Sequence, residues 1–160
     1  MTVGIVVYSH TGNTLGVAKR LEDRLRQMGE DAKLMRVETP DQYQPGRGSV
    51  PPMELPDISG CDTLVFASPV HAFSLSQVMA HCLREIDIPE GTPSAGLVTQ
   101  HLPYTWLGGN RALRGIREVC TARGSRFLGG AVVNWSRRDR EARIEEAIDD
   151  LARTLTSSPS

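Results

Sequence analysis

Residues 3–16 read Val-Gly-Ile-Val-Val-Tyr-Ser-His-Thr-Gly-Asn-Thr-Leu-Gly, and this stretch decides the fold. A short apolar run ends in a hydroxyl-rich turn, after which Leu15, Ala18 and Leu21 recur at helical spacing. The first N–H groups of a helix have no partner within it, and its dipole favours negative charge there. The turn is therefore predicted to bind an anion through six consecutive residues, Ser9, His10, Thr11, Gly12, Asn13 and Thr14.

Two features limit what this turn can be. It lacks the Gly-Lys-Ser/Thr ending of a P-loop and the three-glycine spacing of a dinucleotide fingerprint. It also contains no Lys or Arg, so a phosphate would be held mainly by neutral dipoles. The alternative is a plain strand–helix connection in which Ser, Thr and Asn act as caps.

Length and composition favour one globular domain. A chain of 160 residues can bury a sizeable core, and we expect a domain over 1–155 with a flexible tail over 156–160. The net charge of −1 gives no reason to expect a nucleic-acid partner. No apolar run reaches bilayer length, so membrane insertion is not expected.

Cysteine usage indicates a reducing compartment. Cys61, Cys82 and Cys120 are far apart and lack the spacing of a metal or iron–sulfur site, so no metal is expected. An odd number of cysteines without a secretory segment favours reduced thiols in the cytoplasm.

Strand and helix patterns alternate through most of the chain, which predicts an α/β fold. A parallel sheet with helices on both faces and right-handed crossovers is the usual result, here as a three-layer arrangement of five parallel strands in the order 2-1-3-4-5. Pro69 is expected to end the third strand. The expected strands are 3–8, 32–37, 63–68, 95–99 and 126–134, and the expected helices are 13–28, 75–86, 110–122 and 141–155.

One long connection interrupts this alternation. Residues 38–59 are polar and contain five prolines, so a helix across their middle is unfavourable. We expect a surface crossover in place of a helix. A flap near a ligand, or a segment that docks a partner, is the alternative.

Three loops are expected to meet at the carboxyl ends of the strands, where open α/β sheets bind ligands. Only 5% of the residues are aromatic, yet several follow these strands and could stack on a flat ligand. The alternative roles are loop packing and a helix-initiating turn. Besides the first turn, the predicted site residues are Ser68, Pro69, Val70, His71, Ala72 and Phe73 in the second loop, and Thr99, Gln100, His101, Tyr104, Trp106, Gly108, Gly109 and Asn110 in the third.

These loops resemble those of the flavodoxin family. Ser9, Thr11, Gly12 and Thr14 occupy the places of its Thr/Ser-x-Thr-Gly-x-Thr loop, which wraps the phosphate of flavin mononucleotide (FMN). The second loop looks like the Thr-Pro-Val-Tyr-Ala variants, and residues 106–113 look like a Gly-Gly-Asn-x-Ala-Leu segment. The resemblance implies a short-chain fold with FMN stacked between the loops and one ring edge exposed for electron transfer.

The chain departs from that family in two places. His71 stands where many relatives have tyrosine, and the third loop carries His101 and Arg111 with little acid. Negative charge beside a reduced flavin opposes a further electron, so its scarcity weakens the expectation of a very low potential. It also weakens the expectation of docking to basic partners.

The sequence is compatible with three functions. The favoured one is an electron carrier between a flavin or iron–sulfur reductase and an acceptor, a monomer or weak dimer that needs no catalytic side chain because the flavin carries the chemistry. The alternative is a small FMN-dependent oxidoreductase acting on a quinone or similar diffusible acceptor, with His71, His101 and Tyr104 positioning substrate or moving a proton. A non-redox receiver-like module ranks last, because the acidic cluster that a metal-dependent phosphoacceptor needs is missing after the first strand.

Overall fold

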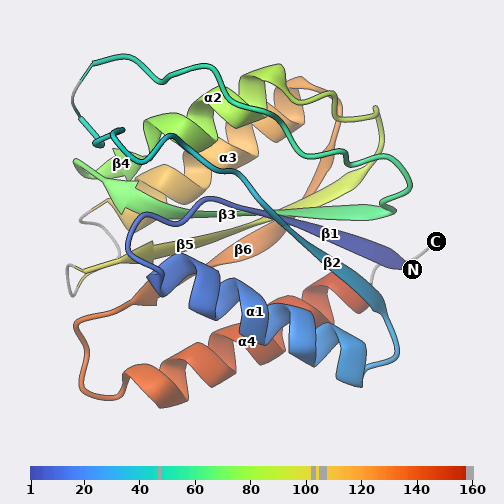
Figure 1. Ribbon diagram of the computed structural model, residues 1–160. Coiled ribbons are helices and arrows are strands. Elements are labelled where there is room, and N and C mark those ends of the chain that lie inside the picture. The colour runs from blue at the N-terminus through green and yellow to red at the C-terminus, as the bar shows by residue number, and fades with distance from the viewer. Residues whose placement is uncertain (47, 102–103, 105–107, 158–160) are drawn as a thin grey trace.

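A computed structural model describes residues 1–46, 48–101, 104 and 108–157. Its central layer is a sheet in the order β2-β1-β3-β5-β6, with all neighbours on this path parallel (Figure 1). The predicted order is therefore confirmed, with β5 and β6 as the fourth and fifth parallel strands. The strands are β1 Thr2–Val7, β2 Asp31–Arg36, β3 Thr63–His71, β4 Ser74–Leu75, β5 Pro93–Gln100 and β6 Arg126–Asn134.

Two pairs of helices complete the three layers. Helices α1 (Asn13–Gln27) and α4 (Arg140–Thr156) cover one face of the sheet, and α2 (Gln77–Glu85) and α3 (Gly109–Ala122) cover the other (Figure 1). Every helix begins and ends within two residues of its prediction. Of the expected tail, the first residue still belongs to α4, and residues 158–160 lie outside the described residues. No helix in the described ranges combines the length and the apolar content needed to cross a lipid bilayer.

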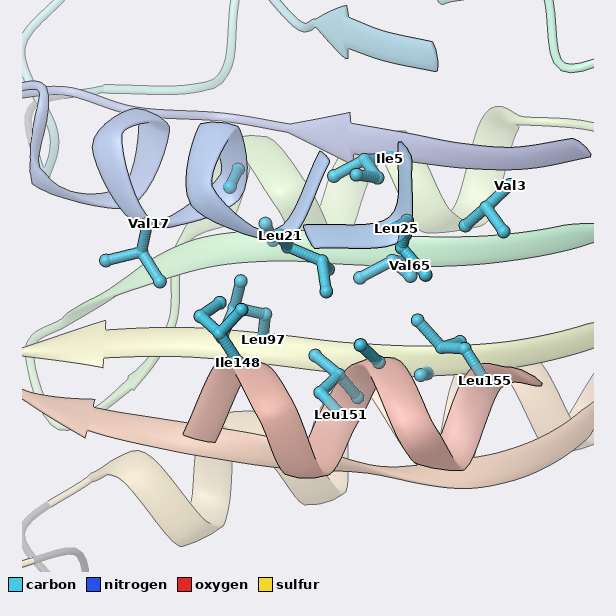
Figure 2. Close-up of a cluster of buried hydrophobic side chains, with 14 of the residues drawn as sticks. Val3, Ile5, Val17, Leu21, Leu25, Val65, Leu97, Ile148, Leu151 and Leu155 are labelled. Carbon is cyan, nitrogen blue, oxygen red and sulfur yellow. The ribbon is translucent and has the colours of Figure 1, made fainter. Parts of the chain in front are cut away.

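The sheet is apolar on both faces, because parallel strands are covered on both sides. On one face, side chains of β1, β3 and β5 pack against α1 and α4, with Leu21, Leu97 and Ile148 at the centre (Figure 2). On the other face, Phe66 and Ile116 belong to a second core beneath α2 and α3.

The long connection between β2 and β3 contains no helix or strand in its described residues. It runs from the carboxyl edge of the sheet back over the α2 side of the molecule (Figure 1). Ile58 is buried in the second core, and Tyr43, Met53 and Leu55 pack against that core. The segment is thus a surface crossover, as predicted.

The prediction that Pro69 ends the third strand is wrong. β3 continues to His71, and Pro69 stays in register with Thr99 of β5. On the other side, pairing with β1 ends at Val7 and Ala67. Successive residues of a strand direct their N–H groups to opposite neighbouring strands. An N–H at position 69 would point toward the β1 side, where the pairing with β1 has already ended. Proline therefore removes no hydrogen bond of the sheet at this position.

The second loop is also more regular than predicted, because it forms a hairpin between β3 and β4. His71 pairs with Ser74 across a two-residue turn, Ala72-Phe73, with φ of 49° and 63°. Positive φ at both central residues is the type I′ pattern that suits hairpins. The following helix begins after Ser76, whose Oγ accepts a hydrogen bond from the Met79 N–H at 3.2 Å.

Candidate functional site

The three loops converge at the carboxyl edge of the sheet, on the left in Figure 1. They enclose a small cavity of about 70 Å³ beside the N-terminal end of α1. Most of its lining was predicted from the sequence, and one wall was not. The lining residues are His10, Thr11, Asn13, Pro69, Val70, His71, Thr99, Gln100, His101 and Trp135.

Ser9 shapes the first loop. Its Oγ accepts hydrogen bonds from the N–H groups of Gly12 at 3.0 Å and Leu15 at 3.2 Å, so it satisfies two donors at the start of α1. Gly12 has a φ of 94°, which glycine adopts without strain, and no atom would lie within 4 Å of a Cβ at this position. The loop is therefore open to solvent at Gly12.

Thr11 and Thr14 differ sharply in their surroundings. Thr14 is buried, and its Oγ1 lies 2.7 Å from Oγ1 of Thr99, a hydrogen bond that ties α1 to β5. Thr11 is exposed beside the cavity, so its hydroxyl is free to meet a ligand. The part that either hydroxyl plays toward an anion stays a prediction.

His71 stands at the centre of a small aromatic group. Its ring meets the ring of Tyr8 edge to face at 6.3 Å between centroids, and the ring of His10 at 6.1 Å. Burial lowers the pKa of His71, and the charge of His10 lowers it further. Near neutral pH the side chain of His71 is therefore uncharged.

The hairpin turn presents Phe73 to solvent, with 56% of its surface exposed. Left-handed backbone in residues other than glycine costs about 1–2 kcal/mol each, so Ala72 and Phe73 are held there by the pairing of β3 and β4. Strain of this kind is frequent at ligand-binding turns.

The two glycines of the third loop serve close packing between protein segments. A Cβ at Gly108 would lie 2.8 Å from both Cα of Phe73 and Cγ1 of Val70. A Cβ at Gly109 would overlap Gln100, and would lie 2.5 Å from Cγ1 of Val132. Both glycines are buried, and whether their N–H groups meet a ligand stays a prediction.

The other described residues of the third loop lie in or near the cavity wall. Gln100 is buried, and its Nε2 donates to the Tyr104 carbonyl at 2.6 Å. Tyr104 is 55% exposed, and His101 and Asn110 are exposed too. The predicted residue Trp106 lies outside the described residues.

Ser68 faces away from this cavity. It is fully buried, and its Oγ lies 2.7 Å from Oγ of Ser76. It therefore supports the hairpin from behind instead of lining the cavity.

Sequence reasoning missed Trp135. It follows the end of β6, and its backbone N–H donates to the Gln100 carbonyl at 2.7 Å. The guanidinium carbon of Arg140 lies 4.9 Å from the centre of the Trp135 ring, and Nη1 of Arg140 donates to the Trp135 carbonyl at 2.7 Å. The available signal was an aromatic residue directly after the fifth strand, at the edge where the other loops meet.

Comparison with known proteins identifies the fold. No protein-family model and no curated protein matches the sequence. Among solved structures, flavodoxin 2 from Bacillus cereus is similar at 18% identity and a TM-score of 0.71, over 98% of this chain and 99% of that chain. A cysteine-to-serine mutant of flavodoxin from Pseudomonas aeruginosa is similar at 17% identity and a TM-score of 0.69, over 97% and 99% of the two chains.

A third structure is a flavoprotein from Lactobacillus acidophilus NCFM in complex with FMN. It is similar at 16% identity and a TM-score of 0.64, over 91% of this chain and 97% of that chain. At such identities the likeness concerns the fold alone, and the fold of this chain is flavodoxin-like.

Proposed function

We propose that this chain, which has the fold of the flavodoxins, binds FMN at the carboxyl edge of its sheet and carries electrons between other proteins. The convergence of the loops after β1, β3 and β5 around one cavity beside the start of α1 supports this proposal most. The Lactobacillus flavoprotein, described in complex with FMN, has a similar fold.

The residues present fit the two ends of such a cofactor. Exposed Thr11 offers its hydroxyl to a phosphate, and the turn at Gly12 is open to solvent, with its own N–H donated to Ser9 Oγ. Among the described residues the exposed large apolar side chains are Met1, Phe73 and Tyr104, and the last two flank the site. Exposed apolar surface at a ligand edge favours contact with a flat, apolar ring.

The cavity is large enough for only part of FMN. Ligand pockets of drug size occupy about 300–1,000 Å³, whereas this one measures about 70 Å³. The rim residues Phe73 and Tyr104 would therefore contact the ring outside the cavity. A ring held at the rim keeps one edge accessible to a redox partner.

The flavin supplies one- and two-electron chemistry when bound, and the chain binds and orients it. Neutral His71 keeps positive charge away from the hairpin side of the site. In an electron carrier no side chain needs to act as a nucleophile or an acid–base catalyst.

The redox partners in this proposal are a reductase with a flavin or iron–sulfur centre and a separate acceptor. Arg111, Arg114 and Arg117 lie along one side of α3, which begins at the site. All three are exposed, and none forms an ion pair with another described residue. A partner with an acidic surface would complement this stripe and associate faster at low salt.

A small FMN-dependent oxidoreductase is the second candidate. Three of the four histidines of the chain, His10, His71 and His101, line the cavity. Histidines clustered around a ligand can exchange protons near neutral pH, which a diffusible acceptor such as a quinone requires.

Substitution of Thr11 tests the cofactor site. Thr11→Val removes an exposed hydroxyl that forms no hydrogen bond with another described residue. Losing one hydrogen bond to a charged group costs about 1.5–3 kcal/mol, so the dissociation constant for FMN should rise about tenfold to a hundredfold. The control is Thr121→Val, the same change at the far end of α3, which should leave FMN affinity unchanged. Equal affinity of Thr11→Val and wild type would place the phosphate elsewhere.

Stopped-flow reduction separates the carrier from the oxidoreductase. The FMN-loaded protein is mixed with NADH or NADPH, with and without a flavin-dependent reductase. A carrier should be reduced slowly alone and rapidly with the reductase. Rapid direct reduction followed by turnover of a quinone would favour the oxidoreductase.

A further inference from the structure

We propose that Trp135 and Arg140 form a cationic subsite that makes this site prefer flavins with a phosphate over flavins without one. The inference rests on the proposed function and extends it to the connection between β6 and α4. The phosphate loop itself contains no Lys or Arg, so any cation near the phosphate must come from another segment.

Trp135 is part of the cavity wall on the phosphate side. It lines the same cavity as Thr11 and Asn13, which flank the start of α1. Its side chain also packs against the core shared by α1 and α4, and its backbone N–H donates to the Gln100 carbonyl. The core therefore holds the side chain of Trp135, and the third loop holds its backbone.

Arg140 places its charge against the ring of Trp135. Its guanidinium lies 4.9 Å from the Trp135 ring centre and is held by the hydrogen bond to the Trp135 carbonyl. Its Nε is buried and has no hydrogen-bond partner among the described residues. The guanidinium is thus oriented toward the indole with donor capacity left over.

The charge of Arg140 is not neutralised within the described part of the chain. Its neighbours Arg137 and Arg143 both form ion pairs with Asp139, at 3.2 and 2.7 Å, whereas Arg140 forms none. Residues 135–143 contain four arginines and two acids, in a chain with a net charge of −1. The connection is therefore a local region of positive potential beside the cavity.

A phosphate monoester carries a charge of about −1.5 to −2 near neutral pH, whereas riboflavin has no charge at that position. Attraction to a partly buried cation is stronger than in bulk water. Arg140 should therefore stabilise bound FMN and leave the binding of the ring unaffected. This predicts selectivity between the two flavins.

The test measures dissociation constants for FMN and for riboflavin, by quenching of flavin fluorescence, in wild type and four variants. Arg140→Gln should raise the FMN constant about tenfold, or 1.4 kcal/mol, and change the riboflavin constant less than about twofold. Arg140→Lys keeps the positive charge and should retain most of the preference for FMN over riboflavin. Trp135→Phe should shift both constants, because the indole forms the wall. The matched control is Arg138→Gln, which removes an exposed charge from the same connection without touching Trp135, and should change neither constant.

Ionic strength provides a second measurement. Raising the salt concentration from about 0.05 to 0.5 M should reduce the FMN preference of wild type more than that of Arg140→Gln, because salt screens the charge. Circular dichroism checks that each variant is folded. If Arg140→Gln unfolds, the FMN preference of Arg140→Lys and the salt dependence of wild type test the cationic subsite in its place.

The outcomes distinguish a failure of the cationic subsite from a failure of the proposed flavin-binding function. If Arg140→Gln weakens both flavins equally, or neither, the cationic subsite is overturned while flavin binding stands. Wild-type protein that binds both flavins with equal affinity overturns it too. Wild-type protein that binds neither flavin overturns the proposed function as well.

Discussion

At the scale of single residues, the hydroxyl pair of Thr14 and Thr99 is the contact that positions the start of α1 over the sheet. Both residues are buried, and their oxygens are 2.7 Å apart. Replacing one partner leaves the other hydroxyl buried without a hydrogen bond, which costs about 1–3 kcal/mol. Replacing both removes the unsatisfied group.

A double-mutant cycle tests this coupling. Thr14→Val and Thr99→Val should each lower the free energy of unfolding by about 1–3 kcal/mol, and the double variant should lose less than the sum. Urea denaturation of the three variants and wild type supplies the values. Additive losses would show that the two hydroxyls do not depend on each other.

The lowered pKa of His71 predicts that the stability of the protein depends on pH. Burial lowers its pKa in the folded state, so below the ordinary histidine pKa the unfolded state binds more protons than the folded state. Stability should be fully present above that pKa and decline as the pH falls from about 7.5 to 5. His71→Gln removes this titration and should flatten the decline measured by urea denaturation. A variant with the wild-type slope would assign the pH dependence to other groups.

Individual site residues were predictable where they directly follow a strand in the sequence. The first loop follows β1 directly, so His10, Thr11 and Asn13 could be assigned to the strand edge and do line the cavity. Trp135 was missed because the connection after the fifth strand was not included among the converging loops. The bond from Ser9 to its own loop, and the burial of Ser68, depend on side-chain rotamers that no sequence pattern encodes.

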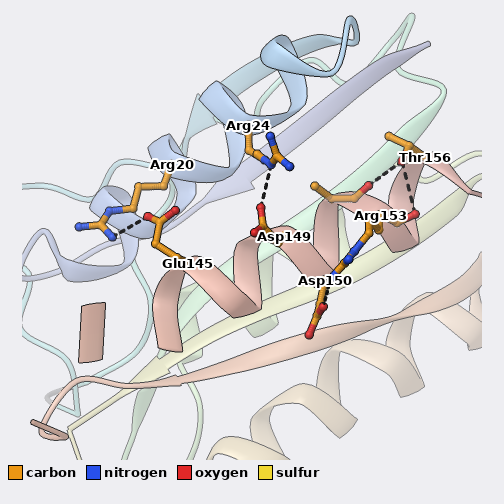
Figure 3. Close-up of polar contacts among 8 residues, drawn as sticks. Arg20, Arg24, Glu145, Asp149, Asp150, Arg153 and Thr156 are labelled. Carbon is orange, nitrogen blue, oxygen red and sulfur yellow. Dashed lines mark hydrogen bonds and ion pairs between the residues drawn. The ribbon is translucent and has the colours of Figure 1, made fainter. Parts of the chain in front are cut away.

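At the scale of helices and strands, two kinds of contact join α1 to α4. Figure 3 shows the ion pairs, Arg20 with Glu145 and Arg24 with Asp149, at 3.1 and 2.7 Å. These side chains are substantially exposed, and such pairs contribute about 0–1 kcal/mol each. Beneath them lies apolar packing that includes Leu21 and Ile148 (Figure 2).

Two substitutions on these helices compare the contributions of the apolar packing and of the ion pairs to stability. Ile148→Ala should lower the free energy of unfolding by about 2–5 kcal/mol, because it leaves a cavity in the core. Arg24→Ala should lower it by less than about 1 kcal/mol. Denaturant midpoints for both variants provide the comparison, and a larger loss for Arg24→Ala would mean that the ion pairs hold α4 in place.

The elements that periodicity encodes were predicted well, and those set by tertiary pairing were not. Apolar spacing and the glycines after α1 and α3, with φ of 87° at Gly29 and 82° at Gly124, gave helix ends close to the observed ones. β4 was missed because it has only two residues and its turn is Ala-Phe, not the Asn-Gly or Asp-Gly that signals a type I′ hairpin. The prediction for Pro69 was wrong because the effect of proline on a strand depends on whether its missing N–H would face a paired neighbouring strand.

At the scale of the whole molecule, strand order decides where the loops meet. In the order β2-β1-β3-β5-β6, the crossovers from β1 and β3 run to opposite sides of the sheet and leave a crevice between them. The cavity lies at that point, and the arginine stripe of α3 and the connection after β6 both begin at the same edge. One edge thus combines the predicted cofactor site with the surface proposed for partners.

A ligand that binds only the folded state should also stabilise the whole molecule. At a free FMN concentration of 100 times the dissociation constant, the gain is about 2.7 kcal/mol. For a domain of this size that corresponds to a rise of several degrees in the melting temperature, which calorimetry with and without FMN would detect.

The most direct measurement of the central claim is a titration of the cofactor-free, folded protein into a fixed amount of FMN, followed by flavin emission and by near-ultraviolet circular dichroism. Emission should fall linearly and level off at one protein per flavin, with an induced circular-dichroism band from the bound ring. Emission that stays at the level of free FMN at a large excess of folded protein would contradict the account.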